Sequence, residues 1–159
     1  MSELGVDRRG ELLAAAERLF SQRGYEATSV RDIAEALDIK AGSLYAHIET
    51  KEDLLWEILT AAADRFFAAV RPIVGSNLVT VEKLRRCVAA HVQVITKSAP
   101  AAAIFTTEWR HLSEPRRREF GARRDEYERI FRGLVQTAIR EGVFGDVDEK
   151  FATLLILSS

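Results

Sequence analysis

Two short helical segments joined by a very short break are the feature that most constrains this fold. The first segment, residues 30–37, repeats apolar side chains at helical spacing, and Thr28 or Ser29 precedes it as an N-cap. The second segment, residues 40–47, follows after a break centred on Asp38. A break of this length leaves room only for a tight turn, so the two helices have to pack against each other. The sequence therefore predicts a compact helix–turn–helix pair near the N-terminus.

Helical periodicity continues on both sides of this pair. A first helix is expected over residues 8–23, where apolar residues recur at helical spacing and Gly24 provides a stop. A long helix is expected from Lys51 to about Pro72. Further helices are predicted in later segments: 81–95, 100–109, 113–138 and 151–157. No segment alternates polar and apolar residues as a half-buried strand does, so the predicted fold class is all-α.

Composition narrows the compartment and the possible chemistry. With 47% hydrophobic and 30% charged residues among 159, the chain can bury a core as a globular protein. Cys87 is the single cysteine, which precludes an internal disulfide framework and favours the reducing cytoplasm. No stretch reaches the roughly 18 uninterrupted apolar residues of a membrane helix, so no membrane partner is expected. His47, His91 and His111 are too scattered in the sequence for a metal site.

Signatures of catalysis do not stand out in the sequence. We find no nucleophile–base arrangement, no glycine-rich phosphate loop and no paired-carboxylate pattern. Neither enzyme activity nor a cofactor is therefore expected.

The outer face of the second short helix has the composition of a DNA-reading surface. Small and polar residues make up this face: Lys40, Ala41, Gly42, Ser43, Tyr45, Ala46 and His47. Gly42 permits close approach, while the polar side chains offer donors to phosphates and base edges. The charge of the region argues the other way, because residues 1–55 hold seven Lys and Arg against eleven Asp and Glu. Helix spacing alone therefore leaves open an ordinary helix pair with no DNA partner.

The stretch from Glu11 to Leu55 resembles the N-terminal DNA-binding domain of the TetR family of regulators. The residues that carry the resemblance are Leu12–Ala16, Leu19-Phe20, Gly24-Tyr25, Ala27–Val30, Asp32–Ala34, Gly42–Tyr45, His47 and Lys51–Leu55. The resemblance implies a three-helix, helix-turn-helix DNA-binding domain at residues 1–50. By position, it implies base-edge contacts from Lys40, Ala41, Gly42 and Ser43. It also implies phosphate contacts from Thr28, Ser29, Tyr45, His47 and Lys51.

Two residues depart from the family pattern. Asp38 stands where glycine is usual, and aspartate tolerates a left-handed backbone better than most residues, so we expect the turn to persist. Ile48 replaces the usual phenylalanine, which reduces packing against the long helix without touching DNA.

The resemblance implies that residues 51–159 form a helical bundle that binds a ligand and forms a homodimer. Segment 151–157 is strongly apolar and needs a partner surface. We therefore expect the C-terminal part of the bundle to be incomplete in this sequence, and another subunit to contribute to the packing.

Aromatic residues with a few polar tips in the bundle indicate a pocket for an apolar effector with a charged end. The candidate ligand-binding residues are His91, Phe105, Trp109, Arg110, Tyr127 and Phe131. Residues 108–112 and 123–131 resemble the acyl-CoA-responsive branch of the family, whose members regulate fatty-acid, phenylacetate or steroid-ring catabolism. This implies an acyl-CoA effector, and other hydrophobic or aromatic effectors remain open.

These observations predict a ligand-responsive transcriptional regulator of double-stranded operator DNA. In the expected mechanism, a homodimeric repressor leaves a palindromic operator when a small hydrophobic effector such as an acyl-CoA binds. The alternative is a helical ligand-binding or interaction protein that does not bind DNA. Activation rather than repression also remains open, because the sequence does not encode where in a promoter the protein binds.

Overall fold

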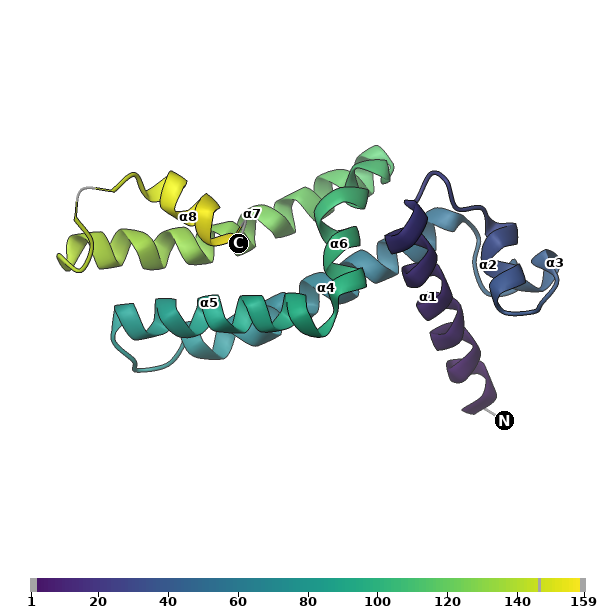
Figure 1. Cartoon of the computed structure of the whole chain (residues 1–159), viewed down its shortest axis with the longest axis horizontal. Helices are drawn as coiled ribbons and strands as arrows, with labels where there is room; N and C mark the ends of the chain where they lie inside the picture. The colour runs from purple at the N-terminus through teal and green to yellow at the C-terminus, as the bar shows by residue number, and fades with distance from the viewer. Residues whose placement is uncertain (1–2, 146, 158–159) are drawn as a thin grey trace. The chain divides into compact units, whose positions relative to one another are not determined.

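The computed structural model of the chain describes residues 3–145 and 147–157, and these consist of helices and the turns between them (Figure 1). The elements are α1 (Glu3–Arg23), α2 (Val30–Ala36), α3 (Ala41–Leu44), α4 (Lys51–Val74), α5 (Thr80–Lys97), α6 (Ala99–Thr107), the 3-10 helix η1 (Glu108–His111), α7 (Glu114–Arg140) and α8 (Glu149–Leu157). None of the described residues forms a strand, which confirms the all-α fold class. Among these helices, none is long and apolar enough to cross a membrane.

The chain divides into two compact units by packing. The head unit comprises residues 1–62 and 98–118, and the bundle unit comprises residues 63–97 and 119–159. The helices α4 and α7 each contribute residues to both units. This division describes packing alone, and the functional boundary at residue 50 stays a prediction.

The start of the head unit follows from local sequence signals, with one difference. Helix α1 begins at Glu3 rather than at Arg8, so its first turns extend beyond the apolar stripe that predicted it. The helix ends where Gly24 takes a left-handed backbone with φ +86°, as the stop signal predicted. At the next helix, Ser29 and Asp32 form a reciprocal capping box, so the cap of α2 is also confirmed.

The turn between α2 and α3 depends on an unusual backbone conformation at Asp38. Its φ is +53°, and it is the one non-glycine residue with a positive φ among the described residues. The expectation that aspartate supports the left-handed turn is therefore confirmed. Helix α3 is shorter than the predicted segment 40–47, because residues after Leu44 continue as a turn.

Apolar side chains fix the short helices in the head unit. Ile33 of α2 and Leu44 of α3 are fully buried, and Ile48 is only 5% exposed. The isoleucine at position 48 therefore fills an interior place despite its departure from the family pattern. Helix α2 packs against α1 and α3, and α6 packs against α1.

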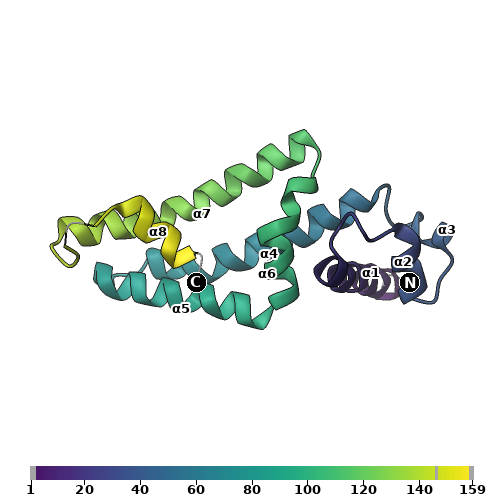
Figure 2. The same cartoon turned by 45° about the horizontal axis from the view of Figure 1, so that its top comes forward.

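The bundle unit contains the second half of α4, α5, most of α7 and α8. Helix α5 returns alongside α4, and α8 returns alongside α7, as both ribbon views show (Figure 2). Gln136 of α7 donates a hydrogen bond to Glu149 of α8 at 2.8 Å, and Thr153 of α8 is fully buried. Aromatic residues occupy the interior of this unit, where Phe120 and Phe131 are fully buried.

Candidate DNA interface and effector site

The outer face of α3 and the turn after it is open to solvent. Gly42, Ser43, Tyr45 and His47 are all exposed, and Tyr45 has 55% of its surface accessible. Beside them, Lys40 and Ala46 are exposed and Ala41 is partly exposed. Leu44 points inward between these residues, so one apolar anchor supports a small and polar outer surface. Such a helix can approach a groove of DNA closely and present donors to it.

Thr28 and Ser29 have their hydroxyl groups engaged within the protein. Thr28 is fully buried, and its Oγ1 donates a hydrogen bond to the carbonyl of Gly24 at 2.8 Å. Ser29 is exposed, and its Oγ accepts from the backbone N–H of Asp32 at 3.2 Å. Both residues therefore fix the start of α2, which carries the exposed Arg31. A phosphate contact by Thr28 or Ser29 stays a prediction.

Lys51 joins α4 to the turn that follows α1, and we call a side chain that links two such elements a bracket. Its Nζ donates hydrogen bonds to the carbonyls of Tyr25 and Thr28, each at 2.8 Å. The same ammonium lies over the ring of Tyr25, 4.0 Å from its centroid. Partial burial lowers the pKa of Lys51. The sequence predicts that Lys51 contacts a DNA phosphate, and this contact stays a prediction. The hydrogen bonds of Lys51 to the turn were not predicted from the sequence.

Arg9 forms a second bracket, which sequence reasoning missed. Its guanidinium donates to the backbone carbonyl of His47, just after α3, and also pairs with the carboxylate of Glu57 on α4. Arg9 of α1 thus joins the turn after α3 to the long helix α4. Arg9 and Glu57 are 48 positions apart, and no local sequence pattern links them.

The 3-10 helix η1 contacts the turn between α1 and α2. Glu108 accepts a hydrogen bond from the backbone N–H of Tyr25 at 2.9 Å. The ring of His111 stacks on the ring of Tyr25 with centroids 5.7 Å apart, and its Nδ1 lies 3.3 Å from a carboxylate oxygen of Glu26. Residues that follow α6 therefore contact the same turn that Lys51 of α4 holds.

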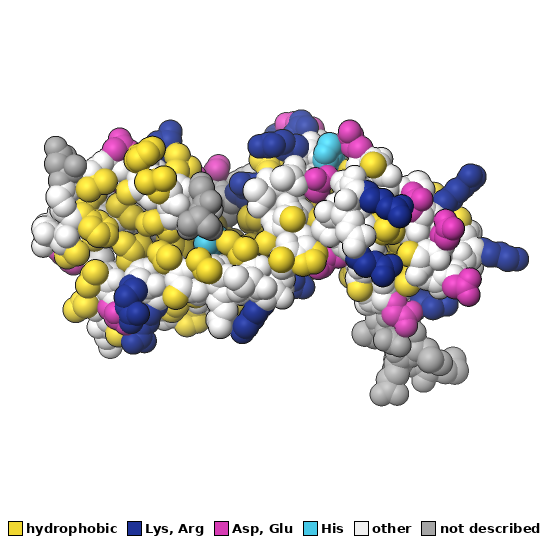
Figure 3. All heavy atoms as spheres, viewed as in Figure 1, with side chains coloured by type: hydrophobic (Ala, Val, Ile, Leu, Met, Phe, Trp, Pro, Cys, Tyr) yellow, Lys and Arg dark blue, Asp and Glu magenta, His cyan; other side chains and the backbone are white. Residues whose placement is uncertain are grey.

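Several acidic residues of the head unit are engaged in contacts within the protein. Several have partners of their own: Glu11 pairs with Arg8, Glu57 with Arg9, Asp53 with Arg116, and Asp32 caps α2. Hydrogen bonds from Ser29 lower the pKa of Asp32. Partial burial opposes a similar change at Asp53, but hydrogen bonds from Arg116 and Thr50 still lower its pKa. Basic side chains project outward beside α2 and α3, with acidic ones between them (Figure 3).

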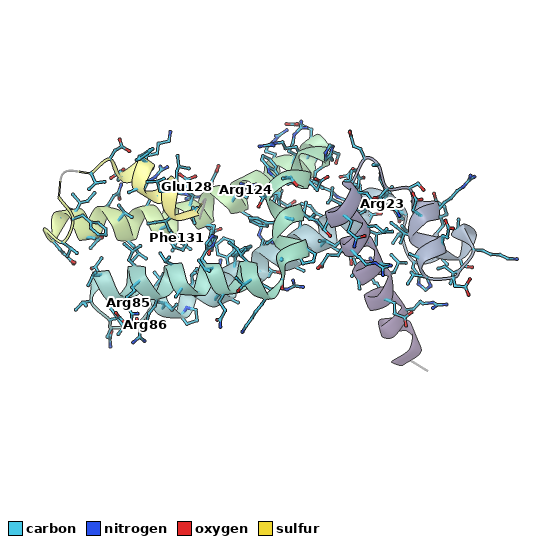
Figure 4. The ribbon with its side chains drawn as sticks, viewed as in Figure 1. Arg23, Arg85, Arg86, Arg124, Glu128 and Phe131 are labelled. Atoms are coloured by element: carbon cyan, nitrogen blue, oxygen red, sulfur yellow. The ribbon has the colours of Figure 1, made fainter. Side chains whose placement is uncertain are left out.

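Three of the predicted effector residues meet in the interior of the bundle unit. The ring centroid of His91 on α5 lies 5.8 Å from that of Tyr127 and 5.9 Å from that of Phe131, both on α7. Phe66 of α4 adds a further ring, 5.2 Å from His91. Phe131 lies on the side of α7 that faces α5 (Figure 4). Burial lowers the pKa of His91 and raises the pKa of Tyr127.

The other three predicted effector residues belong to the head unit. Phe105 and Trp109 are half-buried, and Arg110 is exposed with its guanidinium carbon 5.9 Å from the centroid of the Trp109 ring. The structure therefore groups the six candidates as two sets of three, each within its own compact unit. Within the described residues, no group of three or more His, Cys, Asp or Glu side chains is placed to hold a metal ion.

The exposed α3 face, which follows the left-handed turn at Asp38, is typical of a helix-turn-helix DNA-binding protein. The model for "Bacterial regulatory proteins, tetR family" matches residues 12–58, and that for "Tetracyclin repressor-like, C-terminal domain" matches residues 77–159. The chain belongs to the tetR family of bacterial regulatory proteins. It is a DNA-binding transcriptional regulator, not an enzyme.

Similar proteins include named repressors and solved structures of this family. The chain is 37% identical over 147 residues to the HTH-type transcriptional repressor KstR2 of Rhodococcus jostii, covering 91% of this chain and 72% of that protein. The structure of the ketosteroid transcriptional regulator KstR2 of Mycobacterium tuberculosis superimposes with a TM-score of 0.88 at 34% identity, covering 94% of this chain and 77% of that one. AibR in complex with isovaleryl coenzyme A and operator DNA superimposes with a TM-score of 0.84 at 30% identity, covering 92% and 80%.

Proposed function

We propose that this protein is a homodimeric repressor that leaves its operator when an acyl-CoA binds the helical body. The observation that carries the DNA-binding part is the α3 face, where small and polar residues are exposed around a buried Leu44. The acyl-CoA part is supported by the similarity to AibR, which was solved with isovaleryl coenzyme A and operator DNA, and to the repressor KstR2.

A palindromic DNA site presents two equivalent half-sites, so two copies of the protein are needed to read it. Two recognition helices that read one face of a palindromic site must lie about 34–36 Å apart, one turn of DNA. An effector that favours a conformer with another spacing weakens binding, because only one spacing fits successive grooves. The cytoplasm is the proposed compartment, since both the operator and an acyl-CoA pool are found there.

At residue level, we propose that Lys40, Ala41, Gly42 and Ser43 face base edges and that Tyr45 and His47 contact phosphates. These residues share one exposed face around Leu44. Lys51, Thr28 and Ser29 would then act on the same DNA through the position of the turn and of α2, in addition to any direct phosphate contact.

The experiment is selection of duplex DNA from a random pool by the full chain, followed by affinity measurements at several salt concentrations. We expect an inverted-repeat site. Lys40→Ala should weaken binding by about tenfold or more and make the salt dependence shallower by roughly one phosphate contact. Lys97→Ala is the matched control, because Lys97 is also exposed but lies on α5 in the bundle unit.

Release by an effector is a separate measurement on the selected site. Isovaleryl-CoA and longer acyl-CoAs should dissociate the complex, while free coenzyme A should not. If no duplex is enriched and the chain still binds acyl-CoAs, the protein is a ligand-binding helical protein without DNA binding, and the repressor proposal is wrong.

A further inference from the structure

A hydrogen-bonded pair of polar side chains lies inside the aromatic cluster of the bundle unit. The Nδ1 atom of His91 is 3.1 Å from the hydroxyl oxygen of Tyr127, and each residue is only 6% exposed. Aromatic rings surround the pair, with the centroid of Phe66 5.2 Å from His91 and that of Phe67 5.4 Å from Tyr127. The second ring nitrogen of His91, Nε2, is buried and has no hydrogen-bond partner among the described residues.

Packing alone does not explain the buried Nε2 atom of His91. A buried polar atom without a partner destabilises the folded state, whereas an apolar side chain at the same place would not. Native interiors therefore place such atoms mainly where a further group completes the hydrogen bond. The Nε2 atom of His91 is thus a buried hydrogen-bonding position within an otherwise aromatic interior.

The protonation states of the pair decide what that position can bind. Burial lowers the pKa of His91, so its imidazole is neutral near pH 7, and burial raises the pKa of Tyr127, so its hydroxyl keeps its proton. A phenol is a stronger hydrogen-bond donor than a neutral imidazole, and an imidazole nitrogen is the stronger acceptor. Tyr127 therefore donates to Nδ1, and the proton of the neutral ring resides on Nε2.

The titratable and charged neighbours of the pair do not change this assignment. Cys87, one turn before His91 on α5, is fully buried, and burial raises the pKa of its thiol, so it is neutral. On α7, the carboxylate of Glu128 pairs with the guanidinium of Arg132. The pair therefore offers one neutral N–H donor and no positive charge of its own.

We propose that the Nε2–H of His91 binds an uncharged carbonyl oxygen of the effector, such as that of a thioester, ester or ketone. Tyr127 is the positioning residue, because its hydroxyl fixes the imidazole in the tautomer that donates. A carboxylate is disfavoured at this place, because it would leave water for an aromatic interior that supplies a donor without a compensating charge. This inference rests on the proposed function, in which a small molecule enters the bundle, and it adds the chemical group that the interior recognises.

The first test needs no ligand. Nitrogen-15 NMR of the histidines in the full chain should show His91 as a neutral ring protonated at Nε2, and Tyr127→Phe should shift its population towards the other tautomer. A His91 ring that is protonated at Nδ1 in the unmodified chain overturns the proposal.

The second test compares ligands that differ in the carbonyl alone. The probes are isovaleryl-CoA, the isopentyl thioether of coenzyme A, which lacks the carbonyl, and methyl isobutyl ketone, which lacks coenzyme A. We expect the thioester to bind about tenfold more tightly than the thioether, as one buried hydrogen bond allows. The His91→Leu variant should remove this preference while thioether binding is retained.

The outcomes separate this inference from the proposed function. If the two coenzyme A compounds bind equally well and neither moves the His91 resonances, the carbonyl anchor is wrong and the acyl-CoA response stands. If the ketone shifts the Nε2 resonance while isovaleryl-CoA does not bind, the anchor stands and the proposed acyl-CoA class is wrong. If no probe moves the His91 resonances, the anchor is overturned.

Discussion

The polar contacts inside the head unit differ from the polar pair inside the bundle unit, although each unit has an apolar interior. In the head unit, directed contacts link helices to turns: Arg9 of α1 donates to the carbonyl of His47 after α3, and Lys51 of α4 donates to two carbonyls of the turn after α1. In the interior of the bundle, aromatic rings such as Phe66 and Phe131 meet around one polar pair.

This difference matters because the two kinds of contact fail differently. Loss of a directed contact shifts one segment and leaves the apolar core intact, so recognition suffers more than stability. Loss of a buried ring leaves a cavity that the whole unit must tolerate.

The largest effect is expected from Phe131→Ala, which removes a fully buried ring of the bundle unit. The free energy of unfolding should fall by about 3–5 kcal/mol, because the lost burial is combined with the cost of a cavity. Denaturant unfolding followed by circular dichroism measures it. Val79→Ala is the control, because Val79 is 68% exposed and its truncation should have little effect. A change below about 1 kcal/mol for Phe131→Ala would mean that the aromatic interior does not stabilise this unit as described.

The brackets of the head unit are tested by Lys51→Met, which keeps most of the side chain and removes the ammonium. Because two hydrogen bonds to carbonyls are lost, we expect a loss of about 2 kcal/mol in stability and a weaker DNA affinity. An unchanged salt dependence of binding would mean that Lys51 acts through the turn alone, where its ammonium already donates to two carbonyls. Lys40→Met is the matched variant, with weaker binding, a shallower salt dependence and no loss of stability. If Lys51→Met also makes the salt dependence shallower, Lys51 contacts a phosphate directly.

Asp38 allows a test of the turn itself. Asp38→Val should destabilise the protein by about 1–2 kcal/mol, because a β-branched residue is strained at φ +53°. Asp38→Gly should stay within about 1 kcal/mol of the original chain, since glycine adopts this conformation readily but loses more entropy on folding. Thermal unfolding of both variants gives the comparison, and equal stability of the two would contradict the structural role of the left-handed turn.

A smaller, pH-dependent effect is expected from His91. Its pKa is lowered in the folded chain, so the unfolded chain takes up the proton first as the pH falls. Stability should therefore decrease as the pH falls from about 7.5 through the ordinary histidine range near 6.5, by at most about 1.4 kcal/mol per pH unit for this one group. The His91→Leu variant should lack this component, while the other two histidines remain. Parallel stability profiles of the two proteins between pH 7.5 and 5.5 would show that His91 titrates normally.

The smallest effect is expected at Glu82, where Arg85 and Arg86 of α5 both reach one carboxylate (Figure 4). Hydrogen bonds from these arginines lower the pKa of Glu82 to about 2. Glu82 is partly exposed and both arginines are exposed, so solvent and salt screen the pairs, and Glu82→Gln should leave the melting temperature unchanged. A clear drop would show that this surface pair stabilises α5 more than exposed ion pairs usually do.

Local signals account for what the sequence predicted well. The capping box at Ser29, the stop at Gly24 and the left-handed Asp38 each depend on a few neighbouring residues. The exposure of the α3 face follows from the periodicity that buries Leu44. These features are fixed within one or two turns of the chain, so a pattern in the sequence carries them.

The contacts that sequence reasoning missed are long-range. Lys51 reaches Tyr25 across 26 positions, and Tyr25 meets Glu108 across 83. A charged residue at the start of a helix is compatible with a phosphate, a surface ion pair or an internal carbonyl, and its own neighbours do not distinguish them. The six effector candidates show the same limit, because residue type indicated a pocket but not which rings share one unit.

The Arg9 bracket also has a consequence for the order in which the chain folds. Its partner Glu57 lies 48 residues later, so the contact cannot form until the ribosome has released the start of α4. Closing a loop of this length costs entropy that nearby contacts do not repay early. We therefore expect the residues around His47 to reach their final position only after the first turns of α4 have formed. A fragment cut at residue 50 would lack Lys51, which holds the turn after α1, and Glu57, which pairs with Arg9.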